Sequence, residues 1–220
     1  MKAGRPHFVG ISGGSGSGKT TLVRRIMQEF GDQELALISQ DNYYLSREHL
    51  PRDPEGQVNL DHPSALDLDA LAADLGRLSA GEGFQLQEYN FNHPAIVPRT
   101  LAIHPTPIVV IEGLFVFHHP AVHDILDLKV FVETSENLRL SRRMWRDATE
   151  RGTEGEDILA YYEKFVAPMY RQYIEPFRSD CDLIVPNDRH MEKSTLVLID
   201  HLKAVMRRRV QDASITSTKG

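Results

Sequence analysis

The sequence has little of what several classes of protein require. Its 220 residues include a single cysteine, Cys181, which cannot form a disulfide within the chain, so a disulfide scaffold is excluded. A lone thiol is typical of reducing compartments, and we expect a cytoplasmic protein. The longest apolar run, residues 108–111, is far below the about 20 residues that cross a bilayer. We therefore expect no membrane partner, and the N-terminal segment does not fit a signal peptide.

The sequence also lacks an excess of positive charge. Lysine and arginine number 25 against 31 aspartates and glutamates, which gives a net charge of −6. Nucleic-acid binders use many basic side chains to neutralise phosphates, so no nucleic-acid partner is expected. Glycine (15) and proline (12) occur at average frequencies, which excludes collagen-like and low-complexity chains. The composition indicates a globular protein but not its activity.

Strand-like and helical patterns alternate along the chain. Short buried strands are predicted at 8–12, 35–39, 108–111, 126–132 and 183–185, and helices at 20–30, 66–78, 135–150, 158–173 and 194–206. This alternation predicts an α/β fold, in which a parallel sheet carries helices on both faces. The long segment 40–62 is predicted to be a loop, with a short helix inside it as the alternative, and loops of that length are usually functional or disordered.

Two features interrupt the alternation. Antiparallel strands at 84–91 and 99–104 predict an inserted β-hairpin at about 82–105, and the glycines near 152 predict a helical lid at about 143–160. We expect a single domain over 1–208. Residues 209–220 are polar and unpatterned, and a disordered tail is predicted there.

A glycine-rich segment follows the first predicted strand and fits the pattern G-x-x-x-x-G-K-[ST]. Glycines let successive backbone N–H groups turn around a phosphate, and the helix that follows adds partial positive charge. The lysine supplies a cation for the β- and γ-phosphates, and the next hydroxyl is suited to Mg²⁺. The flanking strand and helix argue against a flexible linker. The predicted nucleotide-binding residues are Gly13, Gly14, Ser15, Gly16, Ser17, Gly18, Lys19, Thr20 and Thr21.

A phosphate loop by itself leaves several functions open. A signalling GTPase would need the guanine-reading pattern N-K-x-D, which does not occur in this sequence. The stretch Asp53-Pro54-Glu55-Gly56 matches D-x-x-G, but a pattern that short is common by chance. The missing pattern argues against a signalling GTPase, and it leaves ATP or GTP open as the phosphoryl donor.

Two acidic residues follow predicted strands. Asp41 comes after the second strand and Glu112 closes the third. In open α/β sheets the chemistry takes place at the carboxyl ends of the strands, so both carboxylates are placed to reach Mg²⁺ or to accept a proton from a hydroxyl. The alternatives are a capping role for Asp41 and a turn role for Glu112.

Arginines recur at i, i+3, i+4 and i+7 in the helix predicted at 135–150 and lie on one face: Arg139, Arg142, Arg143 and Arg146. Arg151 follows, just before a glycine where a lid can hinge. Cations that close over a phosphoryl group stabilise the transition state and exclude water. The alternative is a solvated face tied by the pairs Arg143–Asp147 and Arg146–Glu150.

Together these motifs resemble the uridine–cytidine kinase family of P-loop phosphotransferases, over residues 9–199. The resemblance is carried by the segments 10–21, 39–41, 59–63, 112–113, 139–143, 146–147 and 150–152. The Asp-His-Pro after the long loop and the arginine helix are more specific than the phosphate loop. Phosphoribulokinases share this core and are the nearest rival.

The resemblance implies roles for the acceptor and metal sites. Asp41 is expected to be the general base for the 5′-hydroxyl of a nucleoside. Thr20 and Glu112 are expected to serve Mg²⁺, with Asp41 as a further metal candidate. Asp61 is expected to hold the ribose 2′- and 3′-hydroxyls with the help of Arg143. The alternative for Asp61 is to cap a helix.

The resemblance also implies that Lys19, Arg146 and Arg151 hold the ATP phosphates and act as catalytic residues. Members of the family are often tetramers, so a homo-oligomer is expected by analogy. The residues that bind adenine cannot be placed, because the family's Pro-Arg-Gly after the last strand reads Pro186-Asn187-Asp188 in this chain.

The base-binding end of the pocket departs from the family pattern. The family shows Tyr-Asp-Phe-x-x-His, whereas this chain has Tyr89, Phe91 and, one place early, His93. These three residues, with Tyr44, are the remaining candidates for substrate binding. The alternative for Tyr89 and Phe91 is plain hairpin core. A glutamine expected on the lid is replaced by Tyr161, and such changes can alter the choice of substrate.

The sequence therefore predicts a kinase that uses ATP and Mg²⁺ to phosphorylate the 5′-hydroxyl of uridine or cytidine. A kinase of another small hydroxyl metabolite, such as a ribulose phosphate or an altered nucleoside, is one alternative. A nucleotide-binding regulator without catalysis is another. Trp145, the one tryptophan, is expected to be a packing residue.

Overall fold

The central element of the protein is a parallel β-sheet. In the computed structural model, which describes residues 4–90, 97–151 and 155–217, five strands form this sheet. Their order is β2 (Leu35–Ser39), β5 (Ile108–Glu112), β1 (His7–Ser12), β6 (Leu128–Glu133) and β7 (Leu183–Pro186). The predicted parallel α/β sheet is confirmed.

The two central strands β1 and β5 are buried along almost their whole length, which explains their apolar sequences. The register pairs Ile11 of β1 and Ser39 of β2 with Glu112 of β5. Three neighbouring strands therefore end at the same edge, where the phosphate loop also begins.

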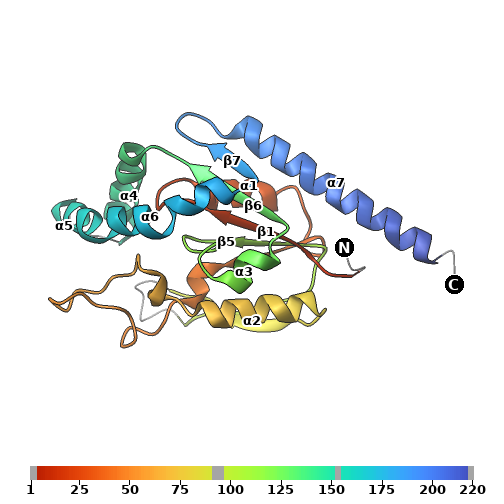
Figure 1. Ribbon diagram of the computed structural model, residues 1–220, viewed down its shortest axis with the longest axis horizontal. Helices are drawn as coiled ribbons and strands as arrows, with labels where there is room; N and C mark the ends of the chain where they lie inside the picture. The colour runs from red at the N-terminus through yellow and green to blue at the C-terminus, as the bar shows by residue number, and fades with distance from the viewer. Residues whose placement is uncertain (1–3, 91–96, 152–154, 218–220) are drawn as a thin grey trace.

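Helices cover both faces of the sheet, as Figure 1 shows. On one face lie α1 (Lys19–Met27) and α7 (Glu192–Ser217). They bury Leu22, Ile26 and Leu202 against the valines and isoleucines that the strands present on that face. On the other face lie α2 (Leu68–Ser79) and α3 (Pro120–Ile125), packed against residues such as Phe8 and Phe131.

A helical group stands at the end of the sheet where the strands carry their carboxyl termini (Figure 1). It consists of α4 (Glu136–Arg151), α5 (Gly155–Tyr161), a π-helical turn η3 (Tyr162–Val166) and α6 (Ala167–Tyr173). The single helix predicted at 158–173 is thus interrupted. Pro168 provides no N–H for the carbonyl of Lys164, and the π-turn lies directly before it.

The inserted hairpin is present as an antiparallel pair, β3 (Phe84–Gln87) and β4 (Thr100–Ile103). Both strands are shorter than predicted. The first was expected to reach residue 91, but beyond Gln87 the backbone N–H of Tyr89 donates to Oδ1 of Asn42 at 3.0 Å and not to a partner strand.

A 3₁₀ turn η1 (Gln40–Tyr43) follows β2, within the segment 40–62 for which a loop with a short helix was one expectation. Two further short elements were not predicted: η2 (Pro63–Ala65) precedes α2, and η4 (Glu175–Asp180) precedes β7. Between η1 and η2 the loop 44–62 closes on itself through a β-bridge between Arg52 and Val58.

The C-terminal segment differs from the prediction. The last helix was expected to end near 206 and to be followed by a disordered tail at 209–220, but α7 continues to Ser217. No glycine or proline between 207 and 217 stops it, which is the physical reason for the extension. Within the part of the chain that the structure describes, no helix is long and apolar enough to cross a membrane.

Candidate active site

The phosphate loop connects β1 to α1, and its backbone conformation requires glycine. Gly13, Gly16 and Gly18 have φ angles of 147°, 79° and 100°, in the region that side chains rarely adopt. A Cβ on Gly16 would also lie 2.5 Å from the carbonyl oxygen of Arg139. The glycine pattern is thus a consequence of both the turn and the close approach of α4.

The loop is fixed from below by two buried polar side chains. The carbonyl of Ser17 accepts hydrogen bonds from Oγ1 of Thr134 at 3.0 Å and from Nδ2 of Asn187 at 2.8 Å. Thr134 follows β6 and Asn187 follows β7, so the ends of two more strands hold the loop. Both supports were missed from the sequence, since only their position after a strand could have indicated them.

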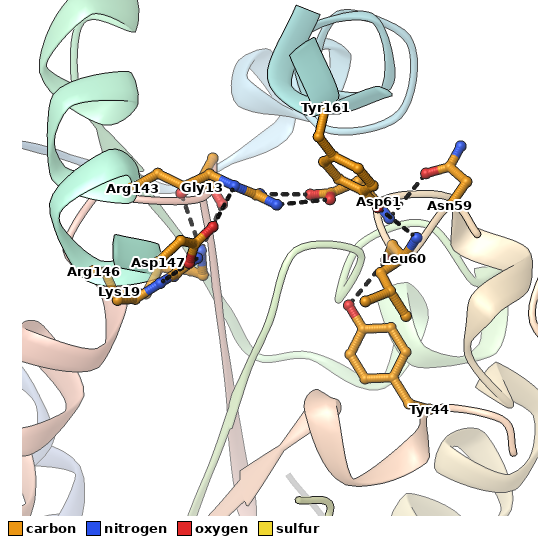
Figure 2. Close-up of polar contacts among 11 residues, drawn as sticks. Gly13, Lys19, Tyr44, Asn59, Leu60, Asp61, Arg143, Arg146, Asp147 and Tyr161 are labelled. Carbon is orange, nitrogen blue, oxygen red and sulfur yellow. Dashed lines mark hydrogen bonds and ion pairs between the residues drawn. The ribbon is translucent and has the colours of Figure 1, made fainter. Parts of the chain in front are cut away.

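Lys19 folds back over the loop. Its Nζ donates to the carbonyl oxygens of Gly13 at 2.7 Å and Gly14 at 3.2 Å. Figure 2 shows Lys19 and Gly13. Burial lowers the pKa of Lys19 to about 8, although the charges of Glu112 and Asp41 act in the opposite direction. The ammonium is therefore held close to the loop and poorly hydrated, which suits it to an anionic ligand.

The two predicted acids lie beside this lysine. Glu112 ends β5, and one of its oxygens accepts a hydrogen bond from Oγ of Ser39 at 2.7 Å. Asp41 lies in η1, directly after β2. Because both charges act on the pKa of Lys19, the three side chains share one electrostatic environment.

The loop, the acids and part of α4 line a single cleft of about 820 Å³. It brings together most of the predicted site residues with several that were not predicted. The lining residues named by the sequence are Ser15, Gly16, Gly18, Lys19, Thr20, Thr21, Asp41, Tyr44, Asp61, Glu112, Arg143 and Arg146.

Other predicted residues lie outside this lining. Ser17 is fully buried beneath the loop. Tyr89 stacks beside Tyr44, with ring centroids 5.2 Å apart, and does not line the cleft. Phe91 and His93 lie outside the described residues, as does the side chain of Arg151 at the end of α4.

Across the cleft from the loop, Asp61 and Arg143 form a two-pronged ion pair (Figure 2). The distances from NH1 and NH2 of Arg143 to the two carboxylate oxygens are 3.2 and 3.3 Å, and each side chain is only 8% exposed. Asp61 does not cap a helix, since that position before η2 is taken by His62. The capping alternative is thus wrong, and the two residues form one buried unit.

Tyr44 is close enough to both Asp41 and Asp61 to be affected by their charges. Its hydroxyl donates to the carbonyl of Leu60 at 3.0 Å, next to Asp61. Burial, together with the charges of Asp41 and Asp61, holds the pKa of Tyr44 well above its ordinary value. The phenol therefore stays protonated and remains a hydrogen-bond donor.

The arginine face of α4 is not a solvated surface. Arg139 is buried, with its guanidinium 3.6 Å from the centre of the Tyr170 ring. Arg142 donates to the carbonyl of Asn187 at 3.0 Å, beside the phosphate loop. The face is therefore turned toward the cleft and the loop.

One of the two alternative pairs lies within the described residues, because Arg143 pairs with Asp147, four residues on, at 3.3 Å. The other pair involves the side chain of Glu150, which lies outside the described residues. Arg146 donates from Nε to Oδ1 of Asp147 at 2.9 Å. Asp147 thus contacts both arginines and offsets the repulsion between their charges. Arg143 also reaches Asp61, and Arg146 lines the cleft with Lys19.

A second, smaller cavity of about 380 Å³ adjoins the loop and shares Gly18, Thr21 and Arg142 with the cleft. The segment after β7 forms much of its wall. It includes Asn187, which stands where the family pattern Pro-Arg-Gly has arginine. The remaining lining residues are Arg25, Arg189, His190, Met191 and Glu192. No location for a donor base could be predicted from the sequence, and this cavity is the candidate.

Trp145 was expected to be a packing residue, and this is wrong. It is 68% exposed and lines the cleft. Ser141 and Arg142 lie one turn before it on α4 and line the same cleft, so this face of the helix is turned toward the cleft.

A parallel sheet with a phosphate loop after β1, carboxylates after two other strands and a helical group over the loop defines a P-loop kinase fold. The solved structure of phosphoribulokinase from Rhodobacter spheroides has this fold, with a TM-score of 0.51, 16% identity, and coverage of 78% of this chain and 69% of that one. At this identity the likeness concerns the fold alone.

Comparison of sequences defines the family. The model of the phosphoribulokinase / uridine kinase family matches residues 8–194, and the chain belongs to this family. It is 36% identical to a uridine kinase of Clostridium perfringens, over 92% of this chain and 97% of that one. It is 38% identical to a uridine kinase of Chloroflexus aurantiacus, over 82% and 87% of the two chains.

The predicted resemblance is thereby confirmed. The protein is a phosphotransferase that acts on a hydroxyl group and takes the phosphoryl group from a nucleotide. The alternative of a regulator without catalysis is not supported, because the matching relatives are kinases.

Proposed function

We propose that this enzyme transfers the γ-phosphoryl group of ATP to the 5′-hydroxyl of uridine or cytidine. The observation that carries the proposal is the buried Asp61–Arg143 pair, which faces the same cleft as Lys19 and Asp41. A carboxylate accepts hydrogen bonds from two neighbouring hydroxyls, so this pair suits the 2′- and 3′-hydroxyls of a ribose. The matching relatives are named uridine kinases.

On the donor side, the backbone N–H groups of the phosphate loop and the cations of Lys19 and Arg146 bind the phosphates. The smaller cavity beside the loop receives the base of the donor, against Asn187 and Met191. Arg151 follows on the same helix and is proposed to join the phosphate contacts when the lid covers the donor.

Mg²⁺ is proposed to bind through Thr20 and Glu112, with Asp41 near it. The residues fit this ion, because a hydroxyl and carboxylates are the oxygen ligands that Mg²⁺ prefers. Among the described residues no cluster of three metal-binding side chains exists. That agrees with an ion held by one or two side chains together with substrate phosphates, where it neutralises charge on the transferred group.

On the acceptor side, Asp61 and Arg143 orient the ribose so that its 5′-oxygen points at the γ-phosphorus. Asp41 accepts the proton of the 5′-hydroxyl as the new oxygen–phosphorus bond forms and the bond to the β-phosphate oxygen breaks. Tyr44 and Tyr89 form an aromatic wall beside Asp41, on the side from which the base would approach. Phe91 and His93 are proposed to complete the base site.

A second candidate acceptor is another small hydroxyl metabolite. The family model covers phosphoribulokinases as well as uridine kinases. In addition, Tyr161 replaces the glutamine of the uridine–cytidine pattern, and it stands directly behind Arg143, 5.6 Å from guanidinium to ring centre. Because Tyr161 contacts Arg143, this replacement can alter how Arg143 and Asp61 bind the substrate, which favours a different acceptor.

The test is a panel of acceptors with release of ADP as the readout. Uridine, cytidine, adenosine, guanosine, ribulose 5-phosphate and fructose are each offered with ATP and Mg²⁺. We expect turnover with uridine and cytidine at the highest kcat/KM. Turnover with a different acceptor only, or none with either pyrimidine nucleoside, would contradict the proposal. A cytoplasmic location and a homo-oligomeric state stay predictions.

A further inference from the structure

The loop that carries Asp61 has a folded tip far from the cleft. Asp53 organises this tip, because its Oδ1 accepts hydrogen bonds from the backbone N–H groups of Glu55 at 3.0 Å and Gln57 at 2.8 Å. The stretch Asp53-Pro54-Glu55-Gly56, which matched a nucleotide-binding pattern by chance, is therefore a turn. None of its residues lines the cleft.

A single lysine of the helical group holds this tip. Lys164, in η3, forms an ion pair with Asp53, and its Nζ lies 2.6 Å from Oε2 of Glu55 and 3.1 Å from Oε1 of Gln57. The Asp53 side chain is only 10% exposed. The hydrogen bond from Lys164 lowers the pKa of Asp53, so the carboxylate stays charged in this contact.

One turn before Lys164, the same helical group holds the base of the loop. The backbone N–H of Leu60 donates to the hydroxyl of Tyr161 at 2.9 Å, and the carbonyl of Leu60 accepts from Tyr44 at 3.0 Å (Figure 2). Leu60 directly precedes Asp61. The loop is thus attached to α5 and η3 at two places, at its tip and beside its functional residue.

From this geometry we infer that Lys164 is a positioning residue for the phosphoryl acceptor. It holds the loop 44–62 against the helical group so that Asp61 meets Arg143 in the cleft, although Lys164 touches neither the cleft nor Asp61. The inference rests on the proposed function, since it takes Asp61 as an acceptor ligand. Without Lys164, Asp53 and Glu55 repel each other, and the tip keeps only its own turn to hold it.

The effect is expected on the acceptor alone. The donor residues lie on the β1–α1 connection, on α4 and after β7, none of which contacts Lys164 in the described residues. A plain surface ion pair would contribute little to stability and leave both KM values unchanged. The separation of acceptor KM from donor KM therefore distinguishes positioning from a merely structural role.

The experiment compares Lys164→Gln with Lys164→Arg and a matched control, Lys203→Gln. Lys203 forms an ion pair of the same length, 2.6 Å to Oε2 of Glu29, on the surface far from the loop. We expect Lys164→Gln to raise the KM for uridine or cytidine about fivefold, the change that about 1 kcal/mol produces. The KM for ATP is expected to stay unchanged, Lys164→Arg to restore the acceptor KM, and Lys203→Gln to alter neither.

An unchanged acceptor KM in Lys164→Gln, or equal rises of both KM values, would overturn the inference and leave the proposed function standing. If the wild-type enzyme phosphorylates neither pyrimidine nucleoside, the proposed function fails instead. The attachment is then tested by amide hydrogen exchange at Leu60 and Asp61. Faster exchange in Lys164→Gln than in Lys203→Gln supports it, and equal exchange refutes it.

Discussion

The donor side and the acceptor side of the cleft are built in different ways. The phosphate loop is one continuous segment, and backbone groups in glycine-dependent conformations do most of its work. The acceptor side is assembled from side chains far apart in sequence, since Arg143 and Asp61 are 82 positions apart and Tyr161 and Leu60 are 101 apart. Few substitutions are tolerated in a loop whose backbone conformation requires glycine. In contrast, a single substitution can change ligand specificity where side chains bind the ligand.

The largest effect is expected where the two sides meet. Asp41→Asn removes the proposed proton acceptor but keeps the size of the side chain, so kcat should fall by about 100- to 10,000-fold. The measurement is ADP release with the accepted nucleoside, and calorimetric titration with ATP serves as the control. Unchanged turnover would contradict the role of Asp41, and lost ATP binding would show that the variant damages the donor side.

Neighbouring arginines on α4 separate the two sides directly. Arg143→Lys loses the two-pronged contact with Asp61, and a compact ammonium cannot replace it, so the acceptor KM should rise about tenfold. The matched variant Arg142→Lys loses a contact beside the phosphate loop, and it should raise the KM for ATP and not that for the acceptor. If both variants change the same constant, the division of the helix face is wrong.

The lowered pKa of Lys19 gives the donor side a dependence on pH. With a pKa of about 8, the ammonium is mostly charged at pH 7 and mostly neutral at pH 9. The Kd for ADP should therefore increase by up to about tenfold over this interval, because a neutral amine attracts phosphate less. Lys19→Arg, which stays charged, should bind more weakly overall but with a flat pH profile. An equal pH dependence in both proteins would assign the titration to another group.

The smallest effect concerns Trp145, which lines the cleft but not the smaller cavity proposed for the donor base. As the one tryptophan of the chain, it reports by fluorescence on what occupies the cleft. We expect a fluorescence change on titration with ATP and an equal one with tripolyphosphate, which lacks a base. Because Trp145 is exposed, Trp145→Leu should change the KM for ATP by no more than about twofold. A response to ATP that tripolyphosphate does not reproduce would place the base beside Trp145 and contradict the assignment of the smaller cavity.

Much of the fold was predictable because its signals are local. The five strands were placed within a few residues by their apolar runs, and the alternation with helices implied the parallel sheet. Errors fell where a distant contact decides the local structure. The first hairpin strand ends early because Asn42 takes the N–H of Tyr89, and the helix predicted at 158–173 is interrupted before Pro168.

The residues of the site were predictable where a local sequence pattern marks them. Lys19, Thr20, Asp41 and Glu112 follow strands or the glycine pattern, and they do line one cleft. Asn187 and Thr134 carry no local signal, since any polar residue after a strand looks alike until the strands are arranged in space. The exposed position of Trp145 also required knowledge of which face of α4 meets the sheet.

The sequence alone determined the phosphate loop, the parallel sheet and the family, because backbone conformation and strand burial depend on neighbours in the chain. Only the tertiary structure decided that Asp61 and Arg143 form one buried unit and that Asp147 contacts two arginines at once. It also decided that Lys164 forms ion pairs with the tip of the loop 44–62. Those contacts join segments far apart along the chain, and their energies depend on burial and direction, which no local pattern contains.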